Sequence, residues 1–506
     1  MAALIHCFNG TRTPLVELRS WNKIVKEQVL GGNSKQALLT YKTMLQNGYS
    51  GDNYTFPVLL KAATQVSYLD IGYVLHGQTM KTGFWMHDFV QTALLNLYSA
   101  LGHLENACKV FKAMTKKDLI AFNSMLEAYA SAGEMDDAAA LFNSMPVNDH
   151  ISFNIMISGF GNIGNVVSAR HFFDKMTNPD VISWNSVICA YAAAGEMSTA
   201  CELFQRMPQR NVASWNTILC GYLQIELYKD VIDLFTEVCN GELEPNHITL
   251  TTVLSACARM GALDIGVEIH KYAMYKGLNM NLHVTASLID MYAKCGSIER
   301  ALEMFYKFES KDKYCWNVII SGLALHGNGH AALDLFKVMQ TRGLSPDDIT
   351  FIGLLSACSH AGLVEEGCQL FESMENMFGI SPKSEHYGCM VDLLSRAGFL
   401  NRAVRLIETM PYEPGVTTWG ALLRACIIHQ DFEKGEMVAK YLTARVDCLG
   451  DGEYIMLANL YSLCGRWDEA DRWRAMMDHS GINKTAGFSM IEVKGTMYKF
   501  LAGGIK

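Results

Sequence analysis

The stretch LIAFNSMLEAYASAGEMDDAAALFNSMPVND, residues 119–149, is the unit from which most of the chain is built. Its glycine, alanine, phenylalanine and methionine recur every 31 residues over four copies. Four residue types that keep one phase indicate a repeat protein. The recurring residues are Gly102, Gly133, Gly164 and Gly195; Ala107, Ala138, Ala169 and Ala200; Phe111, Phe142, Phe173 and Phe204; and Met114, Met145, Met176 and Met207.

Each half of this unit has the periodicity of an amphipathic helix. The first half places Phe122, Leu126 and Tyr129 on one face, and the second half spaces its apolar residues by three or four. Gly133 lies between the halves, where a helix C-cap in the left-handed conformation is expected. Two helices of about a dozen residues cannot bury their apolar faces alone, so the copies must stack on one another. The sequence therefore predicts an all-α solenoid of helix-turn-helix repeats.

The same phase extends in both directions and divides residues 18–415 into twelve copies near 31 or 35 residues long. No Pro/Gly/Ser linker interrupts them, which favours one continuous array. The copies are Leu18–Asp52, Asn53–His87, Asp88–Asp118, Leu119–Asp149, His150–Asp180, Val181–Asn211, Val212–Asn246, His247–Asn281, Leu282–Asp312, Lys313–Asp347, Asp348–Lys383 and Ser384–Gly415.

The two ends of the chain depart from this pattern. Residues 1–17 contain no acidic residue before Glu17, a composition compatible with a short organelle-targeting segment. Residues 416–506 continue as helical pairs with a weaker period. Near the end, Phe488–Val493 and Thr496–Leu501 alternate around Lys494-Gly495, which predicts a short β-hairpin.

The composition excludes several classes of protein. The net charge of −9 argues against a broad basic surface for nucleic acid, although a neutral or basic groove remains compatible with an acidic body. None of the 15 cysteines forms a C-x-x-C motif, so they are expected to be small buried hydrophobes in a reducing compartment. No apolar run reaches the ~18 residues that span a membrane. We expect neither a membrane nor a small molecule as a partner.

Two polar patterns occur early and late in the copies. An aromatic residue followed by asparagine recurs in the first helix of six copies, although asparagine is a poor helix-interior residue. The aromatic ring is expected in the core, and the asparagine, about 100° further around the helix, can face a groove. These asparagines are Asn22, Asn123, Asn154, Asn185, Asn216 and Asn317.

The last residue of most copies is aspartate or asparagine. Such residues before a helix are ordinary N-caps, so capping alone is one interpretation, and capping combined with ligand binding is another. These residues are Asp52, Asp118, Asp149, Asp180, Asn211, Asn246, Asn281, Asp312 and Asp347.

The array resembles the pentatricopeptide repeat proteins of plants, in the class that mixes 35-residue and 31-residue motifs. RNVASWNTILCGY (210–222) and KYCWNVIISGLALHG (313–327) look like the standard motif. ITLTTVLSACARMGALDIGVEIH (248–270) looks like the long variant, and HVTASLIDMYAKCGSIERALEMF (283–305) like the short one. The resemblance implies a right-handed superhelical α-solenoid.

The C-terminal part resembles the family's E-type extension. SEHYGCMVDLLSRAG (384–398) and EPGVTTWGALLRAC (413–426) look like the last short repeat and the start of that extension, and GFSMIEVKGTMYKFLAG (487–503) like its end. The chain departs from the family pattern in three ways. Three short copies follow one another over residues 119–211, Ser395 replaces a usual glycine, and no deaminase-like domain precedes Lys506.

In the resembling family, the two polar positions of a copy together read one base of single-stranded RNA. Asn with Asp implies uridine, Thr with Asp guanosine, Asn with Asn a pyrimidine, and Thr with Asn adenosine. Four copies have Pro57, Ala286, Ile352 or Gly388 at the first position and are not read. The predicted RNA-binding pairs are Asn22/Asp52, Thr92/Asp118, Asn123/Asp149, Asn154/Asp180, Asn185/Asn211, Asn216/Asn246, Thr251/Asn281 and Asn317/Asp347. The implied base order over the twelve copies is U, unread, G, U, U, pyrimidine, pyrimidine, A, unread, U, unread, unread.

The resemblance implies a sequence-specific RNA-binding protein of a plant organelle, the mitochondrion or alternatively the chloroplast. Its E-type extension implies a site-recognition factor for C-to-U RNA editing that is not itself an enzyme and needs no cofactor. A deaminase-bearing pentatricopeptide repeat protein, or another editing factor, would act in trans through residues 416–506. The alternatives are an RNA splicing or transcript-stabilising factor and, in another class, a protein-binding scaffold.

Two weaker patterns are interpreted as chance. His103-Leu104-Glu105 matches half of a zinc deaminase motif, but no P-C-x-x-C follows it. His326 and His330 have metal-ligand spacing in a turn that offers no third ligand. We therefore expect no metal site and no catalytic residues.

Overall fold

The computed structural model describes residues 14–482 except 242, 310 and 445–448, and the strand residues 488–493, 496–501 and 504–505. Only the last four residues of the predicted targeting segment 1–17 are described, in the helix that starts at Pro14. The chain forms two compact units, residues 1–225 and residues 226–506, each of which is described by itself. The division falls in the short turn between the two helices of the copy Val212–Asn246.

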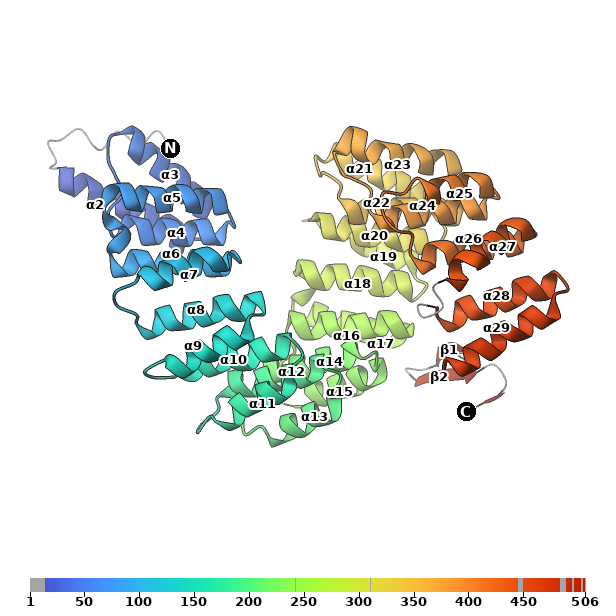
Figure 1. Ribbon diagram of the computed structural model, residues 1–506, viewed down its shortest axis with the longest axis horizontal. Coiled ribbons are helices and arrows are strands. Elements are labelled where there is room, and N and C mark those ends of the chain that lie inside the picture. The colour runs from blue at the N-terminus through green and yellow to red at the C-terminus, as the bar shows by residue number, and fades with distance from the viewer. Residues whose placement is uncertain are drawn as a thin grey trace. The chain divides into compact units, whose positions relative to one another are not determined.

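The first unit is a stack of antiparallel helix pairs (Figure 1). Each even-numbered helix packs against the next even-numbered helix. From α2 to α12, each even-numbered helix also packs against the odd-numbered helix that follows it, so the helices form two layers. The helices are α2 (Pro14–Leu30), α3 (Ser34–Gln46), α4 (Thr55–Gln65), α5 (Leu69–Thr82), α6 (Asp88–Ala100), α7 (Leu104–Ala113), α8 (Leu119–Ala132), α9 (Met135–Ser144), α10 (His150–Asn162), α11 (Val166–Asp174), α12 (Val181–Ala193), α13 (Met197–Arg206) and α14 (Val212–Gln224), with the 3-10 turn η1 (Phe84–Met86).

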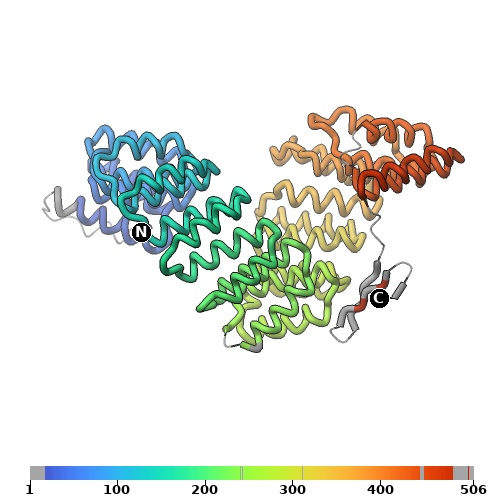
Figure 2. The backbone as a smooth tube through the Cα atoms, turned by 60° about the horizontal axis from the view of Figure 1, so that its bottom comes forward, coloured from blue at the N-terminus to red at the C-terminus, as the bar shows by residue number. Residues whose placement is uncertain are grey.

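The second unit repeats this two-layer arrangement, and each helix pair lies beside the preceding pair of its own unit (Figure 2). It begins with α15, the second helix of a copy. The helices are α15 (Tyr228–Asn240), α16 (His247–Met260), α17 (Leu263–Tyr275), α18 (Leu282–Lys294), α19 (Ile298–Lys307), α20 (Lys313–Leu325), α21 (Gly329–Thr341), α22 (Asp348–Ala361), α23 (Val364–Phe378), α24 (Ser384–Arg396), α25 (Leu400–Glu408), α26 (Val416–Ile428), α27 (Phe432–Thr443), α28 (Asp451–Leu463) and α29 (Trp467–His479), with the 3-10 turn η2 (Leu278–Met280).

The predicted β-hairpin is confirmed at the end of the second unit. Strand β1 (Phe488–Val493) pairs antiparallel with β2 (Thr496–Leu501), so that Val493 lies opposite Thr496. A short third strand, β3 (Gly504–Ile505), pairs with β2. The α-solenoid expected from the sequence is thus present in both units, with a small sheet after the last helix.

The residues that repeat every 31 positions hold the copies together. Gly133 ends α8 in the left-handed conformation at φ 79°, where a residue with a Cβ is strained. Ala138 is fully buried. Phe142 packs edge-to-face against Phe153 of the next copy, with ring centroids 5.1 Å apart. Aromatic pairs of this geometry stabilise by about 0.5–1.5 kcal/mol beyond the burial of their area.

The same aromatic contact recurs between later copies. Phe173 packs on Trp184, and Phe204 on Trp215, both at 4.8 Å. The aromatic residue that precedes the asparagine is thus packed between copies, but only Trp316 is fully in the core as predicted, and the other five are half-buried. Because its neighbour in the chain is the asparagine, the aromatic contact also fixes the helix turn that carries the predicted binding residue.

The layer of even-numbered helices is packed closely at small residues. A Cβ added to Gly161 in α10 would lie 2.7 Å from the Cβ of Ala190 in α12, a distance that real Cβ atoms essentially never show. The small side chains thus let successive first helices approach one another. The predicted polar pairs connect these same helices.

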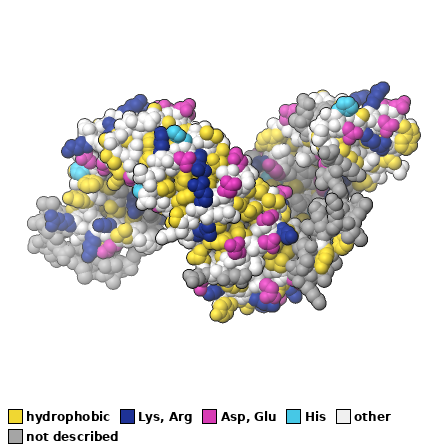
Figure 3. All heavy atoms as spheres, turned by 90° about the horizontal axis from the view of Figure 1, so that it is seen from below, with side chains coloured by type: hydrophobic (Ala, Val, Ile, Leu, Met, Phe, Trp, Pro, Cys, Tyr) yellow, Lys and Arg dark blue, Asp and Glu magenta, His cyan; other side chains and the backbone are white. Residues whose placement is uncertain are grey.

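The expectation that the cysteines are buried is confirmed for Cys257, Cys315, Cys358 and Cys426, whereas Cys189 and Cys239 are exposed. The thirteen cysteines in the described part of the chain are free thiols. Burial is the largest cause that raises the pKa of Cys315, Cys358 and Cys426 to about 12, so these thiols are unreactive at neutral pH. On the face shown in Figure 3, acidic and basic side chains are interspersed with hydrophobic ones. No described helix is long and apolar enough to cross a membrane.

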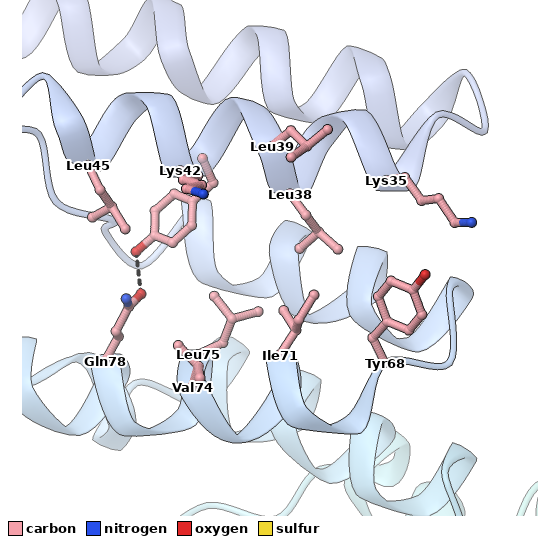
Figure 4. A pocket seen from close by; sticks show the side chains of 11 residues that line it. Lys35, Leu38, Leu39, Lys42, Leu45, Tyr68, Ile71, Val74, Leu75 and Gln78 are labelled. Carbon is pink, nitrogen blue, oxygen red and sulfur yellow. Dashed lines mark hydrogen bonds between the residues drawn. The ribbon is translucent and has the colours of Figure 1, made fainter.

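An apolar groove of about 490 Å³ lies between α3 and α5 in the layer of odd-numbered helices (Figure 4). Leu38 and Leu39 of α3 face Ile71 and Val74 of α5. At one end of the groove, the hydroxyl of Tyr41 donates to Gln78 Oε1 at 2.7 Å. This groove is on the layer opposite to the one that carries the predicted polar pairs.

Candidate nucleic-acid interface

A polar cluster joins α8 to the start of α10. Asn123 Nδ2 donates a hydrogen bond to Asp149 Oδ1 at 3.2 Å. The hydroxyl of Ser152, the third residue of the next copy, lies 2.8 Å from Asn123 Oδ1 and 2.7 Å from Asp149 Oδ1. The backbone N–H of Ser152 also donates to Asp149 Oδ1, at 2.8 Å. The structure thus brings this predicted pair together and adds a third residue to it.

The same three-residue cluster forms near both ends of the repeat array. In the first copy, Asn22 Nδ2 donates to Asp52 Oδ2 at 3.1 Å, and Thr55 Oγ1 donates to Asn22 Oδ1 at 2.6 Å. In the second unit, Asn317 Nδ2 donates to Asp347 Oδ1 at 3.0 Å.

The hydroxyl again completes this second-unit cluster. Thr350 Oγ1 donates to Asn317 Oδ1 at 2.6 Å. Three pairs predicted from the sequence are therefore closed by direct hydrogen bonds, at Asn22, Asn123 and Asn317.

The last residue of most copies also caps the helix that follows. Asp52 accepts the backbone N–H groups of Tyr54 and Thr55 just before and at the start of α4. The capping interpretation is therefore correct, and in the three closed clusters capping coexists with the contact to the asparagine. The residues whose side chains accept a backbone N–H as the N-cap are Asp118, Asp149, Asp180, Asn211, Asn246, Asn281, Asp312 and Asp347.

These contacts keep the capping aspartates ionised. Partial burial on its own would raise the pKa of Asp149, but hydrogen bonds from the backbone N–H and hydroxyl of Ser152 and from the Asn123 amide bring it below 3.8. Burial opposes ionisation of Asp180 and Asp347 as well, but hydrogen bonds outweigh it. Ser183 and Asn154 lower the pKa of Asp180, and Thr350 and Asn317 lower the pKa of Asp347. Asp149, Asp180 and Asp347 therefore carry a negative charge at neutral pH.

The asparagines are more buried than the sequence predicted. Asn123 is 8% exposed and Asn317 5%, because the cap and third residue of the next copy pack over them, and Asn216 in α14 is 7% exposed. Most of the surface of these asparagines is therefore covered by the neighbouring copy or helix. In Asn154 and Asn185, Oδ1 is buried and has no hydrogen-bond partner among the described residues.

A groove of about 720 Å³ nevertheless runs along the layer of even-numbered helices at this cluster. Asn123 lines it together with serine, asparagine and isoleucine side chains, so the edge of the cluster is open to a ligand. The lining residues are Thr64, Asn96, Ser99, Ala100, Gly102, Ile120, Asn123, Ser124, Glu127, Ser131, Ile151 and Ile155.

The sequence interpretation missed a stripe of exposed apolar residues beside the clusters. The second residue of eight copies is a large apolar side chain left in solvent, and its constant position in the copy is the signal that could have revealed it. Such side chains offer flat contact surface to unstacked bases. They are Tyr54, Phe89, Ile120, Ile151, Ile182, Ile248, Tyr314 and Ile349.

Two predicted pairs are not joined in the structure. Thr92 Oγ1 donates to the carbonyl of Asp88, whereas Asp118 accepts from Ala121. Thr251 Oγ1 donates to the carbonyl of Ile248 in the same way. A threonine side chain is too short to reach across to the next cap and turns to its own helix backbone instead.

The pair Asn216/Asn246 belongs to two different units. Asn216 is buried in α14 of the first unit, and Asn246 is the N-cap of α16 in the second.

The two chance patterns are accounted for locally. His326 Nε2 lies 2.7 Å from the carbonyl oxygen of Ala293 in the preceding copy, so this histidine connects neighbouring copies. Glu105 forms an exposed ion pair with Lys109. Within the described ranges, no group of three His, Cys, Asp or Glu side chains is placed to hold a metal ion.

Known families match most of the chain. A pentatricopeptide repeat model, described as PPR repeat, matches residues 92–119, 120–150, 151–178, 182–212, 286–312, 349–377 and 385–413. A second model, described as PPR repeat family, matches residues 210–259 and 311–360. A pentatricopeptide repeat-containing protein of Arabidopsis thaliana is 37% identical over 469 residues, covering 93% of this chain and 77% of the relative.

The chain belongs to the pentatricopeptide repeat family. An Arabidopsis relative named chloroplastic is 42% identical to this pentatricopeptide repeat protein over 521 residues, covering 96% of the chain and 85% of the relative. Another, named mitochondrial, is 36% identical over 489 residues, covering 97% of the chain and 63% of the relative.

An E motif model matches residues 429–492, so this pentatricopeptide repeat protein carries the E-type extension predicted from its C-terminal motifs. The matched models describe repeats and this extension, in line with the expectation that the protein is not an enzyme.

Solved structures of the maize pentatricopeptide repeat protein PPR10 are also similar to this chain. One matches at 16% identity and a TM-score of 0.48, covering 92% of this chain and 80% of that one. Another, of PPR10 in complex with an 18-nt psaJ RNA element, matches at 18% identity and a TM-score of 0.49, covering 95% and 77%.

Proposed function

We propose that this protein binds single-stranded RNA sequence-specifically, one base to each read copy. The observation that carries the proposal is the Asn–Asp cluster, which is repeated in phase on one layer of the solenoid and whose Asn123 lines a groove there. A scaffold for proteins would not need the same donor and acceptor at the same place in successive copies.

The free atoms of the cluster match the edge of uracil. Asn123 Nδ2 carries two N–H donors, and Asp149 takes one of them. No described residue donates a hydrogen bond to Oδ2 of Asp149, which leaves an acceptor beside that donor. Uracil offers an N–H next to a carbonyl oxygen and complements this arrangement. In the copy that ends at Asn211, an amide replaces the carboxylate and both accepts and donates, which suits either pyrimidine.

The exposed apolar stripe supports the same proposal. Ile120, from the same copy as Asn123, and Ile151, from the next copy, both line the groove together with Asn123. A base inserted between two such side chains is desolvated and held flat, so that its edge meets the cluster. Double-stranded RNA does not expose base edges in this way, which makes a single strand the fitting ligand.

The E-type extension suggests the role of the bound RNA. We propose that the protein selects sites for C-to-U editing and that the extension, residues 416–506, binds a deaminase-bearing pentatricopeptide repeat protein or another editing factor. The chloroplastic and mitochondrial names of its relatives support an organelle, and the mitochondrion is the organelle we propose. The catalytic zinc site would belong to the partner.

A binding assay and an RNA comparison test the two levels of the proposal. The full chain is titrated with single-stranded RNAs that follow the implied base order in either polarity, and with scrambled RNAs of the same composition. We expect tighter binding to one ordered RNA, weakening with added salt as phosphate contacts are screened. Equal affinity for ordered and scrambled RNAs would refute sequence-specific reading.

Organellar RNA from plants that lack the protein then tests editing. Loss of C-to-U conversion at a defined site whose upstream sequence fits the base order is the expected result. If every editing site were intact and an intron were retained or a transcript lost, the protein would instead be a splicing or stabilising factor.

A further inference from the structure

We propose that the hydroxyl of the third residue of the following copy determines base specificity by fixing the orientation of the asparagine amide. The inference rests on the proposed RNA reading and adds a third residue to each two-residue reader. It assigns a positioning role to Ser152 for Asn123, to Thr55 for Asn22 and to Thr350 for Asn317.

The hydrogen bonds of these hydroxyls define the role. Ser152 Oγ accepts the backbone N–H of Asp149 at 3.2 Å and lies 2.8 Å from Asn123 Oδ1. Its single proton therefore has two acceptors within reach, the amide oxygen of Asn123 and Asp149 Oδ1 at 2.7 Å, of which the amide oxygen is the one that this proton can orient. Asp149 is ionised and can only accept, so it takes the Nδ2 side of the same amide. The hydroxyl and the carboxylate together select one of two amide orientations.

The pattern of residue types along the chain supports this coupling. Each of the six reader asparagines is followed, at the third residue of the next copy, by serine or threonine. The two reader threonines, Thr92 and Thr251, have no amide to orient, and Ala121 and Val284 occupy the corresponding places. The six hydroxyl residues are Thr55, Ser152, Ser183, Ser214, Thr249 and Thr350.

The copies that follow an unread copy mostly lack a hydroxyl at their third residue as well. The residues in that place are Val90, Cys315, His386 and Thr418. Thr418 follows Gly388, which has no side chain to orient. If this hydroxyl served only a capping box, serine or threonine would be expected as the third residue of these first helices regardless of whether the preceding copy has a reader asparagine.

The hydroxyl proton has a second acceptor within reach. Ser183 Oγ donates to Asp180 Oδ1 at 2.8 Å, and Asn154 Oδ1 is then buried without a partner. Burying an acceptor without a donor is unfavourable, so the Asn123 arrangement, in which the hydroxyl serves the amide, is the more stable one. Without any hydroxyl, the amide gains by turning Oδ1 toward the groove. The base would then meet an acceptor in place of a donor.

Removing the hydroxyl is therefore expected to change which base is preferred. The full chain and its Ser152→Ala variant are titrated with four RNAs that differ only at the nucleotide read by Asn123 and Asp149. Wild type should prefer U at that nucleotide. Ser152→Ala should lower the preference for U over C by about fivefold to tenfold, while preferences at other nucleotides stay unchanged. Ser152→Thr keeps the hydroxyl, as threonine does at Thr55 and Thr350, and should keep the wild-type preference.

Two further variants separate positioning from capping. Thr350→Val removes a hydroxyl with little change of shape and should lower the U preference only at the nucleotide read by Asn317 and Asp347. Ala121→Ser adds a hydroxyl beside Thr92 and should leave the base preference of that copy unchanged. A similar loss of affinity for all four RNAs on Ser152→Ala and Thr350→Val would show that the hydroxyl only caps the helix and would overturn the inference.

The outcomes distinguish this inference from the function on which it rests. A wild-type U preference that survives both hydroxyl deletions overturns the positioning role alone. Absence of any base preference in wild type overturns the proposed RNA reading and the inference with it.

Discussion

Asn123 and Asp149 are 26 residues apart in the sequence, and Nδ2 of the first donates to Oδ1 of the second at 3.2 Å. Asp149 is at the same time the N-cap of α10, where it accepts the N–H of Ser152. The contact therefore ties the first helix of one copy to the first helix of the next. A side-chain pair held by a helix cap is already ordered before any ligand arrives, which lowers the entropy lost on binding.

Exchanging a complete pair should exchange the base. The double variant Asn154→Thr, Asp180→Asn has threonine with asparagine, the pair that implies adenosine in this family. We expect the preferred base at that nucleotide to shift from U to A by about tenfold, measured by titration of RNAs that differ only there. Val167→Ala, in the layer of odd-numbered helices, is the matched control and should leave the preference unchanged. A double variant that still prefers U would contradict the assignment of this pair.

The exposed isoleucines should contribute affinity without specificity. Ile151 is 58% exposed, so Ile151→Ala should leave the thermal unfolding midpoint almost unchanged. If Ile151 packs against a bound base, the variant should bind RNA roughly fivefold to tenfold more weakly whatever the base. Val147→Ala, another exposed apolar residue outside the stripe, serves as control. Unchanged RNA affinity on Ile151→Ala would exclude the stripe from the interface.

Sequence periodicity predicted the architecture because its signals are local. Gly133, Ala138 and Phe142 lie at fixed places in one copy, and their roles as helix cap and core follow from helix geometry. The hairpin around Lys494-Gly495 was likewise predictable from alternation and a turn dipeptide. These features depend on residues within one turn or one helix of each other.

The composition of the binding cluster was only partly predictable, since it depends on how copies stack. The sequence identified Asn123 and Asp149 but not Ser152, because the distance between a side chain and the next copy follows from packing. It placed the asparagine toward a groove but could not show that the neighbouring cap covers most of the Asn123 amide. Ile151 was missed because helix periodicity separates a buried face from an exposed one but does not say which exposed face lines a groove.

Removing a core phenylalanine should destabilise the stack without touching the binding residues. Phe204 is buried and packs edge-to-face on Trp215 of the next copy at 4.8 Å. Phe204→Ala should lower the free energy of unfolding by about 3–5 kcal/mol, as expected for a cavity in a packed core. Urea denaturation followed by circular dichroism measures the loss, and the exposed Val167→Ala variant should change stability by less than about 0.5 kcal/mol. A small effect of Phe204→Ala would mean that the ring does not connect the copies.

The capping aspartates should make the protein sensitive to acid. The folded-state pKa of Asp149, Asp180 and Asp347 lies below the ordinary value of 3.8, so ionisation favours the folded state. This contribution is fully present above the unfolded-state pKa and is lost as the pH falls through the folded-state pKa. The contribution of these groups to the thermal unfolding midpoint should therefore stay constant between pH 7 and about pH 5, and the midpoint should decrease at pH values below about 4.

A non-titrating cap isolates this effect. Asp149→Asn keeps an oxygen that accepts from Ser152 but carries no charge to lose, so its midpoint should fall less steeply with acid than that of wild type. The base preference at the nucleotide read by Asn123 should be the same at pH 5 and pH 7 in wild type, because Asp149 stays ionised over that range. A U preference that disappears between pH 7 and pH 5 would show that Asp149 is protonated there, contrary to the hydrogen bonds that Ser152 and Asn123 donate to it.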